Sequence, residues 1–144
     1  YTLSRSERLR PGRDWTLFES DQTHVLNFAW TVRLGNDWQL GARFQLTSGN
    51  PYYPIIDARY DVDSDTHTPI YSATQSRLRV YHRLDLRVDK TWRFDTWMFE
   101  LYLDIQNVYN ASNPESPTYS FDYRQRGGGA SLPFLPTLGF RMVF

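Results

Sequence analysis

The sequence contains no cysteine, so neither a disulfide framework nor a thiolate metal site is possible. Its formal net charge is zero at pH 7, which argues against a nucleic-acid-binding domain. It also lacks any apolar run of about 18 residues, which excludes a membrane-spanning helix. Strands of a membrane barrel are shorter and alternate in polarity, so their mean hydropathy stays low. The low mean hydropathy therefore does not separate a water-soluble protein from such a barrel.

Aromatic residues, in contrast, are abundant. They make up 17% of the 144 residues, as 10 Tyr, 9 Phe and 5 Trp. The length suits one domain. Because membrane barrels gather aromatic side chains at their two interfaces, the positions of these residues along the predicted strands become informative.

Two neighbouring segments, residues 24–34 and 38–47, alternate between apolar and polar residues and predict a β-hairpin. The turn Gly35-Asn36-Asp37 contains residues that tolerate a positive φ. It sets Leu34 opposite Trp38, so that both strands present their apolar residues on one face. The face predicted to point outward consists of Leu26, Phe28, Trp30, Val32, Leu34, Trp38, Leu40, Ala42, Phe44 and Leu46. We expect Arg33 and Arg43 on the other face.

A second hairpin is predicted from Tyr81–Trp92 and Trp97–Asn110. A turn around Asp95-Thr96 sets Arg87 opposite Asp104 on the polar face. The same register predicts the pairs Trp92 with Phe99 and Lys90 with Leu101. Lys90 lies near the end of the apolar face, where a lysine can extend towards lipid headgroups. Asn107 interrupts that face near its other end.

The last predicted strand is Leu135–Phe144, and it has one continuous apolar face. The polar face contains Thr137, Gly139 and Arg141. The apolar face contains Leu138, Phe140, Met142 and Phe144. This pattern resembles the closing strand of a bacterial outer-membrane barrel, whose final aromatic residue is bound by the barrel-assembly machinery. We therefore expect an assembly signal formed by Gly139, Phe140, Met142 and Phe144.

The connections alternate between long and short. Residues 8–22, 48–80 and 111–134 are predicted as long loops, with a Pro11-Gly12 turn in the first and Pro114 in the third. The segment 48–80 is long enough to contain a hairpin of its own. A strand of about ten residues tilted by about 40° rises about 25 Å, the height of an outer-membrane apolar band. The predicted short-turn end gathers Trp38, Trp92, Trp97 and Phe144. Together these features predict an all-β fold, an antiparallel transmembrane β-barrel segment of about six strands.

Several motifs resemble the C-terminal part of TonB-dependent outer-membrane receptors. The resemblance covers nearly the whole chain, and the loops contribute least. The motifs are Asp21-Gln22-Thr23-His24-Val25-Leu26-Asn27, Leu40-Gly41-Ala42-Arg43-Phe44, Ser48-Gly49-Asn50-Pro51-Tyr52, Leu84-Asp85-Leu86-Arg87-Val88-Asp89-Lys90-Thr91-Trp92, Tyr102-Leu103-Asp104-Ile105-Gln106-Asn107-Val108-Tyr109-Asn110 and Leu138-Gly139-Phe140-Arg141-Met142-Val143-Phe144.

The resemblance implies an active transporter located in the bacterial outer membrane, not an enzyme, and no cofactor. Such receptors import ferric siderophores, cobalamin, nickel complexes or oligosaccharides through a barrel of about 22 strands with a plugged lumen. Residues 1–144 would form the C-terminal part of that barrel domain. The implied partners are outer-membrane lipid, the remainder of the barrel with its plug, the barrel-assembly machinery, a small-molecule ligand and, through an N-terminal box, the TonB complex. The plug and this box are not in the sequence.

The two longer loops contain the candidate ligand-binding residues. Aromatic rings stack on sugars or catecholates, and arginines attract anionic ligands. The candidates are Tyr52, Tyr53, Tyr60, Tyr71, Tyr119, Tyr123, Arg124 and Arg126. Phe121 lies among them. The alternative is that these side chains pack against neighbouring loops.

Three other groups of residues favour structural roles. The acidic segment Asp61–His67 offers oxygen ligands for Ca²⁺, but Thr66 replaces the glycine of an EF-hand loop, so a solvated loop is the preferred interpretation. The carboxylates Asp85, Asp89, Glu100 and Asp104 lie beside Arg83 and Arg87 and predict ion-pair ladders inside a barrel, not a glycosidase pair. The histidines His24, His67 and His82 accompany no nucleophile motif, so hydrolase chemistry has no support.

Two other classes of protein are compatible with the same pattern. One is a small outer-membrane barrel that does not transport, such as an adhesin. The other is a soluble β-sandwich binding module. A plug domain upstream of Tyr1 would favour the receptor over the first, and detergent-free solubility as a monomer would favour the sandwich.

Overall fold

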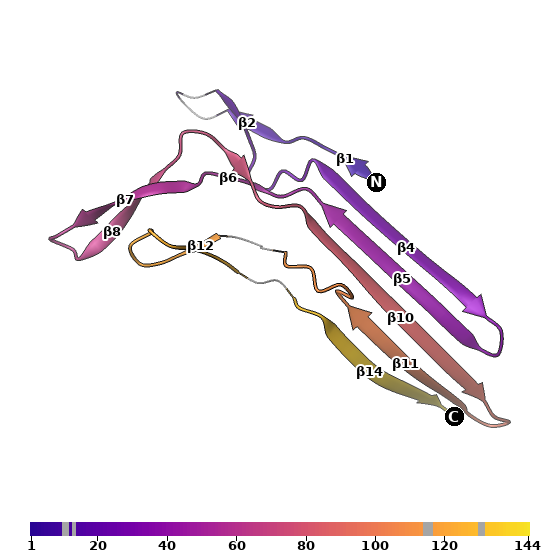
Figure 1. Ribbon diagram of the computed structural model, residues 1–144. Coiled ribbons are helices and arrows are strands. Elements are labelled where there is room, and N and C mark those ends of the chain that lie inside the picture. Colours follow the sequence, from indigo (N-terminus) through magenta and orange to yellow (C-terminus); the bar gives the residue numbers. More distant parts are fainter. Residues whose placement is uncertain (10–11, 13, 114–116, 130–131) are drawn as a thin grey trace. The chain divides into compact units, whose positions relative to one another are not determined.

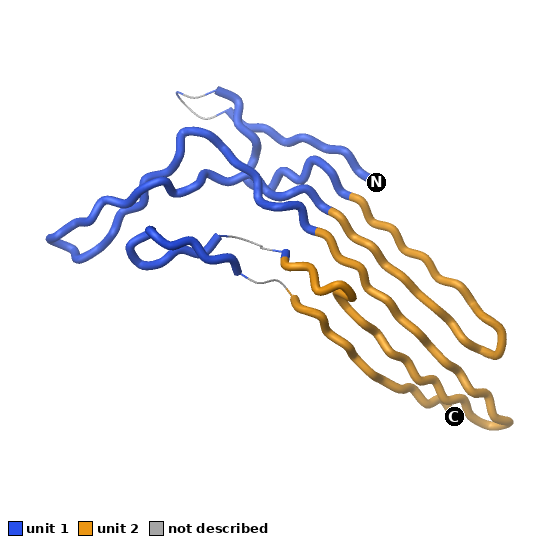
Figure 2. The backbone as a smooth tube through the Cα atoms, viewed as in Figure 1, with its two compact units in different colours: residues 1–25, 47–81, 113–131 blue, residues 26–46, 82–112, 132–144 orange. Residues whose placement is uncertain are grey.

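The computed structural model describes residues 1–9, 12, 14–113, 117–129 and 132–144. Regular structure in these residues is entirely β-strand, which confirms the predicted all-β class. Contacts divide the chain into two compact units, coloured separately in Figure 2. Unit 1 comprises residues 1–25, 47–81 and 113–131, and unit 2 comprises residues 26–46, 82–112 and 132–144.

The largest sheet is antiparallel and has six strands in the order β1-β4-β5-β10-β11-β14 (Figure 1). The bounds are β1 Thr2–Leu3, β4 His24–Leu34, β5 Trp38–Thr47, β10 Tyr81–Arg93, β11 Met98–Gln106 and β14 Leu135–Val143. The predicted number of about six strands is confirmed. Among the described residues the sheet does not close on itself, because β1 and β14 are its edges.

The register of β10 on β11 is the predicted one. It contains the pairs Arg87 with Asp104, Trp92 with Phe99, and Lys90 with Leu101. Strand β14 then adds to β11 with matching faces. Apolar residues meet in the pairs Phe99 with Met142, Leu101 with Phe140, and Leu103 with Leu138. Polar-face residues meet in the pairs Glu100 with Arg141, Tyr102 with Gly139, and Asp104 with Thr137. Since side chains alternate across a strand, this register keeps both faces continuous.

The two faces of the strands in unit 2 have opposite character. On the apolar face, Leu138 is 70% exposed, Phe140 69% and Phe28 57%. On the polar face, Asp85 and Asp89 are each only 6% exposed. Among the described residues of the whole chain, no hydrophobic side chain is buried. The usual arrangement of a water-soluble protein is therefore reversed for these groups, since the carboxylates Asp85 and Asp89 are shielded and large apolar side chains lie outside.

The arginines of the first hairpin lie on the polar face, as predicted. Arg43 binds Asp85 of β10 through its guanidinium. Arg33 lines a shallow polar pocket together with Arg87 and Glu100. The prediction that the even-numbered apolar residues of β4 and β5 point to the other side is thereby confirmed.

The second hairpin ends earlier than predicted. Strand β11 stops at Gln106, whereas the pattern predicted a strand up to Asn110. Asn107 adopts a positive φ of 52°, and Asn110 has a φ of 50°. Asparagine tolerates this left-handed conformation because its short amide bonds nearby backbone groups. The strand therefore ends where a local side-chain network replaces the ladder.

The N-terminal part also differs from the prediction. Of the first seven residues, only Thr2–Leu3 pairs with β4. Residues 8–22 were predicted as a loop, yet β2 (Glu7–Leu9) and β3 (Trp15–Leu17) form a short hairpin. Gly12 has a φ of 73°, a conformation that favours glycine. Pro11 of the predicted turn lies outside the described residues.

Unit 1 consists of short hairpins and the segments that join them. The longest pairs β7 (Ile55–Asp61) with β8 (Thr66–Tyr71), which confirms a hairpin within residues 48–80. Two smaller pairs are β6 (Pro51–Tyr52) with β9 (Ser76–Arg77) and β12 (Pro117–Tyr119) with β13 (Arg126–Gly128). The predicted loop 111–134 thus contains a small hairpin, and its Pro114 lies outside the described residues.

Candidate functional site

The polar face of unit 2 centres on the carboxylate of Asp85. Its Oδ2 accepts hydrogen bonds from Arg43 Nη2 at 2.8 Å and from Arg43 Nε at 3.2 Å. Its Oδ1 accepts the backbone N–H of Asn107 at 3.0 Å and lies 3.1 Å from Arg83 Nε. A buried carboxylate needs such partners to offset the loss of water. Asp85 therefore joins β5, β10 and the end of β11.

A second cluster surrounds Arg87. Its guanidinium lies 2.6 Å from Asp89, 3.8 Å from Glu100 and 4.0 Å from Asp104. The predicted Arg87–Asp104 cross-strand pair is confirmed at the outer limit of an ion pair. Glu100 also accepts from Arg141 of β14 at 2.6 Å. The carboxylates considered for glycosidase chemistry are thus members of an ion-pair ladder, as predicted.

Gly139 has a specific packing partner. The guanidinium carbon of Arg87 lies 4.2 Å from the ring centroid of Tyr102. A Cβ added to Gly139 would stand 2.3 Å from that ring. Tyr102 therefore covers the bare backbone of β14, and this contact gives Gly139 a role in strand packing in addition to the predicted assembly signal.

Aromatic side chains gather at the short-turn end of unit 2. Trp97 stacks on Phe94 with a centroid distance of 4.2 Å and on Phe144 at 6.3 Å. Lys90 Nζ lies 5.4 Å from the Trp38 ring and 5.5 Å from the Trp92 ring. The ammonium reaches the carbonyl oxygen of Asn36 in the turn. Lys90 therefore extends towards the turn, and its contact with lipid headgroups stays a prediction.

Asn107 is fully buried, with 0% exposure. Its Nδ2 donates to the carbonyl oxygens of Ala111 at 3.1 Å and Leu132 at 2.9 Å. Its Oδ1 accepts the N–H of Ala111 at 2.8 Å. The side chain thereby satisfies three backbone groups where β11 has ended. The sequence pattern predicted Asn107 only as an interruption of the apolar face. The nearby Asn110 was the available signal that the strand ends here, because asparagine tolerates a positive φ.

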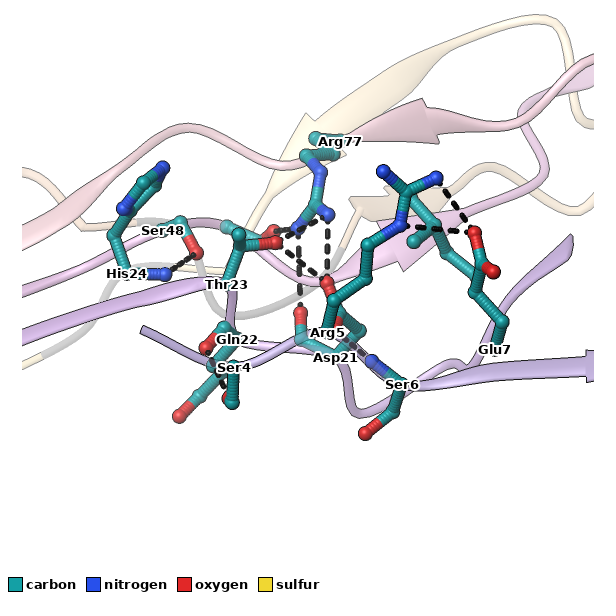
Figure 3. A network of polar contacts seen from close by, with 12 residues as sticks. Ser4, Arg5, Ser6, Glu7, Asp21, Gln22, Thr23, His24, Ser48 and Arg77 are labelled. Carbon is teal, nitrogen blue, oxygen red and sulfur yellow. Dashed lines mark hydrogen bonds and ion pairs between the residues drawn. The ribbon is translucent and has the colours of Figure 1, made fainter. Parts of the chain in front are cut away.

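In unit 1 the corresponding buried polar residue is Asp21, shown in Figure 3. Its carboxylate accepts the N–H of Ser6 at 2.7 Å, the hydroxyl of Thr23 at 2.7 Å and Arg77 Nη2 at 2.6 Å. Arg77 Nη1 also donates to the carbonyl oxygen of Gly49 at 3.1 Å. The Asp21 network therefore ties together segments that are far apart in the sequence. No spacing signal linked Asp21 to Arg77.

The Asp21 network also sets the ionisation of its central group. Burial favours the neutral acid and would raise the pKa of Asp21. The hydrogen bonds from Ser6, Arg77 and Thr23 and the charge of Arg77 outweigh burial and lower the pKa from 3.8 to about 2. Asp21 is therefore ionised at neutral pH.

Four of the eight predicted ligand-binding residues line one cavity of about 780 Å³ in unit 1. They are Tyr52, Tyr53, Tyr71 and Tyr119. Apolar residues such as Pro51, Ile55 and Pro117 complete its walls. A volume of about 300–1,000 Å³ is usual for small-molecule pockets. We call this space the aromatic cavity.

The other four line a second cavity of about 420 Å³, also in unit 1. They are Tyr60, Tyr123, Arg124 and Arg126, together with Tyr119 of the first cavity. His67, Asp57 and Asp122 contribute further polar groups. We call this space the charged cavity. Tyr119 and Ile55 line both cavities, so all eight predicted residues surround two adjoining spaces.

The acidic segment forms the turn of the β7–β8 hairpin. Asp61 accepts the N–H of Asp63 at 3.1 Å, and Asp65 accepts the hydroxyl of Tyr60 at 2.8 Å. Hydrogen bonds from Ser64 and Asp63 lower the pKa of Asp61. Among the described residues, no group of three or more His, Asp or Glu side chains is placed to hold a metal ion. The carboxylates of this turn are used within the turn.

Comparison with protein-family models, curated proteins and solved structures gives no match for this chain. In the part of the chain that the structure describes, no helix is long and apolar enough to cross a membrane.

Proposed function

We propose that this chain is the C-terminal part of the barrel of a TonB-dependent outer-membrane receptor, which imports a scarce small molecule. The observation that carries the proposal is the inversion of the two faces in unit 2. Leu138 is 70% exposed and Phe140 69%, while Asp85 and Asp89 are each 6% exposed. A barrel wall has this character, with lipid outside and a polar lumen inside.

The open edges of the sheet support the same proposal. In lipid, each unpaired backbone N–H or C=O costs several kcal/mol, so membrane-spanning strands belong to closed barrels. Strands β1 and β14 each have one neighbour in the described sheet. Bacterial barrels have at least about eight strands. Further strands of the same or another chain would have to pair with these edges.

The end of unit 2 that contains the short turns supports a membrane interface. Trp38, Trp92, Trp97 and Phe144 lie there, and Lys90 extends along the aromatic rings towards the turn. Aromatic rings prefer the headgroup level because one part of the ring system is apolar and the other polar. In the proposed receptor this is the periplasmic end.

The cavities of unit 1 support a role in ligand capture. They bring together tyrosines and arginines from two predicted loops, as a binding site requires. In the proposed receptor these loops are extracellular, the barrel-assembly machinery inserts the chain, and the plug and the TonB complex supply gating and energy.

The first test is the behaviour of residues 1–144 alone. The outer sides of the edge strands β1 and β14 have no neighbour among the described residues, so we expect aggregation or oligomers on size exclusion in detergent and no heat-modifiable migration. A monodisperse, protease-resistant monomer in detergent-free buffer would contradict the proposal and favour a soluble β-sandwich.

The second test concerns transport. Cells that produce the whole protein should accumulate its ligand only when the inner membrane is energised and TonB is present. Fractionation should place the protein in the outer membrane. Accumulation that ignores both conditions would indicate a passive barrel, and a location in the periplasm would contradict the membrane assignment itself.

A further inference from the structure

We propose that the two cavities of unit 1 together bind a small molecule with a flat aromatic ring and an anionic group, of the aryl carboxylate class. This rests on the proposed function for the view that unit 1 captures a ligand. The class of ligand itself follows from the groups that line the two cavities.

The aromatic cavity fits the ring of such a molecule. Its walls are formed mainly by tyrosine rings and by proline and isoleucine side chains, with Glu19 as its one charged residue among those described. Flat rings pack on tyrosines in offset or edge-to-face geometry, which contributes about 0.5–1.5 kcal/mol per pair beyond area burial. Its volume of about 780 Å³ accommodates a ring system larger than one benzene ring.

The charged cavity contains a cation whose charge is not neutralised nearby. Among the described residues, no carboxylate lies within ion-pair distance of Arg126, whereas Arg124 lies 4.0 Å from Asp122. The Arg126 guanidinium carbon stands 5.4 Å from the ring centroid of Tyr52. Because Tyr52 lines the aromatic cavity and Arg126 the charged one, the cation lies where the two cavities adjoin.

A buried ring nitrogen in the charged cavity also lacks a partner among the described residues, and it can donate in the Nδ1–H tautomer of His67. His67 Nδ1 is buried and makes no hydrogen bond to the described residues. Its ring is held between Tyr60, at a centroid distance of 5.0 Å, and Phe121, at 5.2 Å. A buried polar atom without a partner costs about 1–3 kcal/mol, so a ligand oxygen placed there would recover that energy.

The carboxylates of the charged cavity, in contrast, are already hydrogen-bonded. Asp57 accepts the N–H of Ala58 at 2.8 Å. Asp122 accepts the hydroxyl of Ser120 and the N–H of Arg124 at 3.2 Å, and these bonds lower the pKa of Asp122. The nitrogen groups without a partner, the Arg126 guanidinium and the His67 ring nitrogen in its Nδ1–H tautomer, can both donate to the oxygens of an anionic ligand.

The test compares two soluble probes on the whole protein purified in detergent, with binding followed by saturation-transfer NMR. The probes are 4-hydroxyphenylacetate, which has a ring and a carboxylate, and its neutral relative 4-hydroxyphenylethanol. We expect the anion to bind more tightly to the wild type. Equal affinities, or tighter binding of maltotriose, would overturn the proposal.

Two substitutions test whether the anionic group of the ligand binds Arg126. Arg126→Gln should weaken binding of the anion about tenfold, the usual size of a charge-assisted hydrogen bond, and leave the neutral probe unchanged. The matched control is Arg59→Gln, the same charge change on β7 at a residue that lines neither cavity. Anion binding that is as tight in Arg126→Gln as in the wild type would overturn the assignment. The unchanged neutral probe reports that the variant is folded.

Failure of this inference can be distinguished from failure of the proposed transport function. Binding in detergent needs neither a membrane nor TonB, so charge-dependent binding without uptake would contradict only the proposed function. TonB-dependent uptake of a neutral ligand with no effect of Arg126→Gln would contradict only this inference.

Discussion

Units 1 and 2 are held together in different ways. In unit 2, long strands repeat a two-residue alternation, and the register of three neighbouring strands keeps apolar and charged faces separate. In unit 1, short hairpins are joined by side chains that bond the backbone, above all Asp21 and Arg77. The comparison teaches that backbone pairing between long strands stabilises unit 2, whereas a few buried polar side chains stabilise unit 1.

Asn107 tests how far unit 2 also depends on such a side chain, and it should give the largest effect. Asn107→Ala leaves the backbone groups of Ala111 and Leu132 without partners and places alanine at a positive φ. We expect a loss of about 3–4 kcal/mol in the free energy of unfolding, measured by urea titration of the whole protein in bilayers. The control Asn110→Ala, which removes one bond to Phe134, should cost clearly less. Equal losses would mean that Asn107 has no special role.

Asp21 tests the polar organisation of unit 1. Its folded pKa, about 2, lies below the ordinary value of 3.8. A depressed carboxyl pKa stabilises the fold above the unfolded pKa, and this contribution is lost as pH falls through the folded pKa. We therefore expect up to about 2 kcal/mol to disappear between about pH 4 and pH 2.

The measurement is pepsin cleavage within residues 1–25 and 47–81 over that pH range. Cleavage should rise steeply towards pH 2 in the wild type, and Asp21→Asn should already be cleaved at pH 4. The control is Asp63→Asn in the exposed β7–β8 turn. If Asp21→Asn resists cleavage at pH 4 as well as this control does, the Asp21 network does not hold unit 1 together.

A substitution at Gly139 tests how much the pairing of β14 with β11 contributes to the stability of unit 2. Gly139→Ala places a methyl group against Tyr102, which must then leave its stacked position beside Arg87. We expect a cost of about 1–3 kcal/mol by urea titration. The matched control is Gly41→Ala, where the nearest atom to an added Cβ is 3.8 Å away. Adding Tyr102→Ala to Gly139→Ala should recover part of the loss, and a purely additive double variant would contradict the packing explanation.

The Arg87–Asp104 pair should give the smallest effect. Its atoms are 4.0 Å apart, and Arg87 has a closer partner in Asp89 at 2.6 Å. A double-mutant cycle of Arg87→Gln and Asp104→Asn should yield a coupling energy of about 0.2–1 kcal/mol. A coupling well above that range would show that the ladder is stabilised by individual ion pairs more than by backbone register.

The regular unit was predictable from the sequence, and the irregular one largely was not. Period-two alternation, with the short turns, was sufficient to predict the pairing of Arg87 with Asp104 because a register shift by one residue would invert both faces. The eight ligand-site candidates were chosen by residue type, and the structure brings them around two adjoining cavities. Their function as a binding site remains a proposal.

The structural features that the sequence did not predict have a common physical origin. Gln75 bonds the backbone of Leu17 in β3, and Asn107 bonds that of Ala111 beyond the end of β11. Asp21 bonds the backbone of Ser6 as well as the guanidinium of Arg77. Such bonds follow no periodicity, since one asparagine or aspartate can end a strand or join distant segments. Only the three-dimensional arrangement reveals which of the many polar residues has this role.

The most direct test of the central claim, that the inverted faces of unit 2 separate lipid from a polar lumen, uses the absence of cysteine from residues 1–144, with any cysteine elsewhere in the whole protein replaced. Single cysteines at Phe28, Leu138 and Phe140, and at Thr31, Thr137 and Arg141 of the opposite face, can be labelled with bimane in the whole protein reconstituted in bilayers. Brominated lipid should quench the first three labels strongly and the last three weakly. Equal quenching on the two faces, or stronger quenching at Thr31, Thr137 and Arg141, would contradict the account.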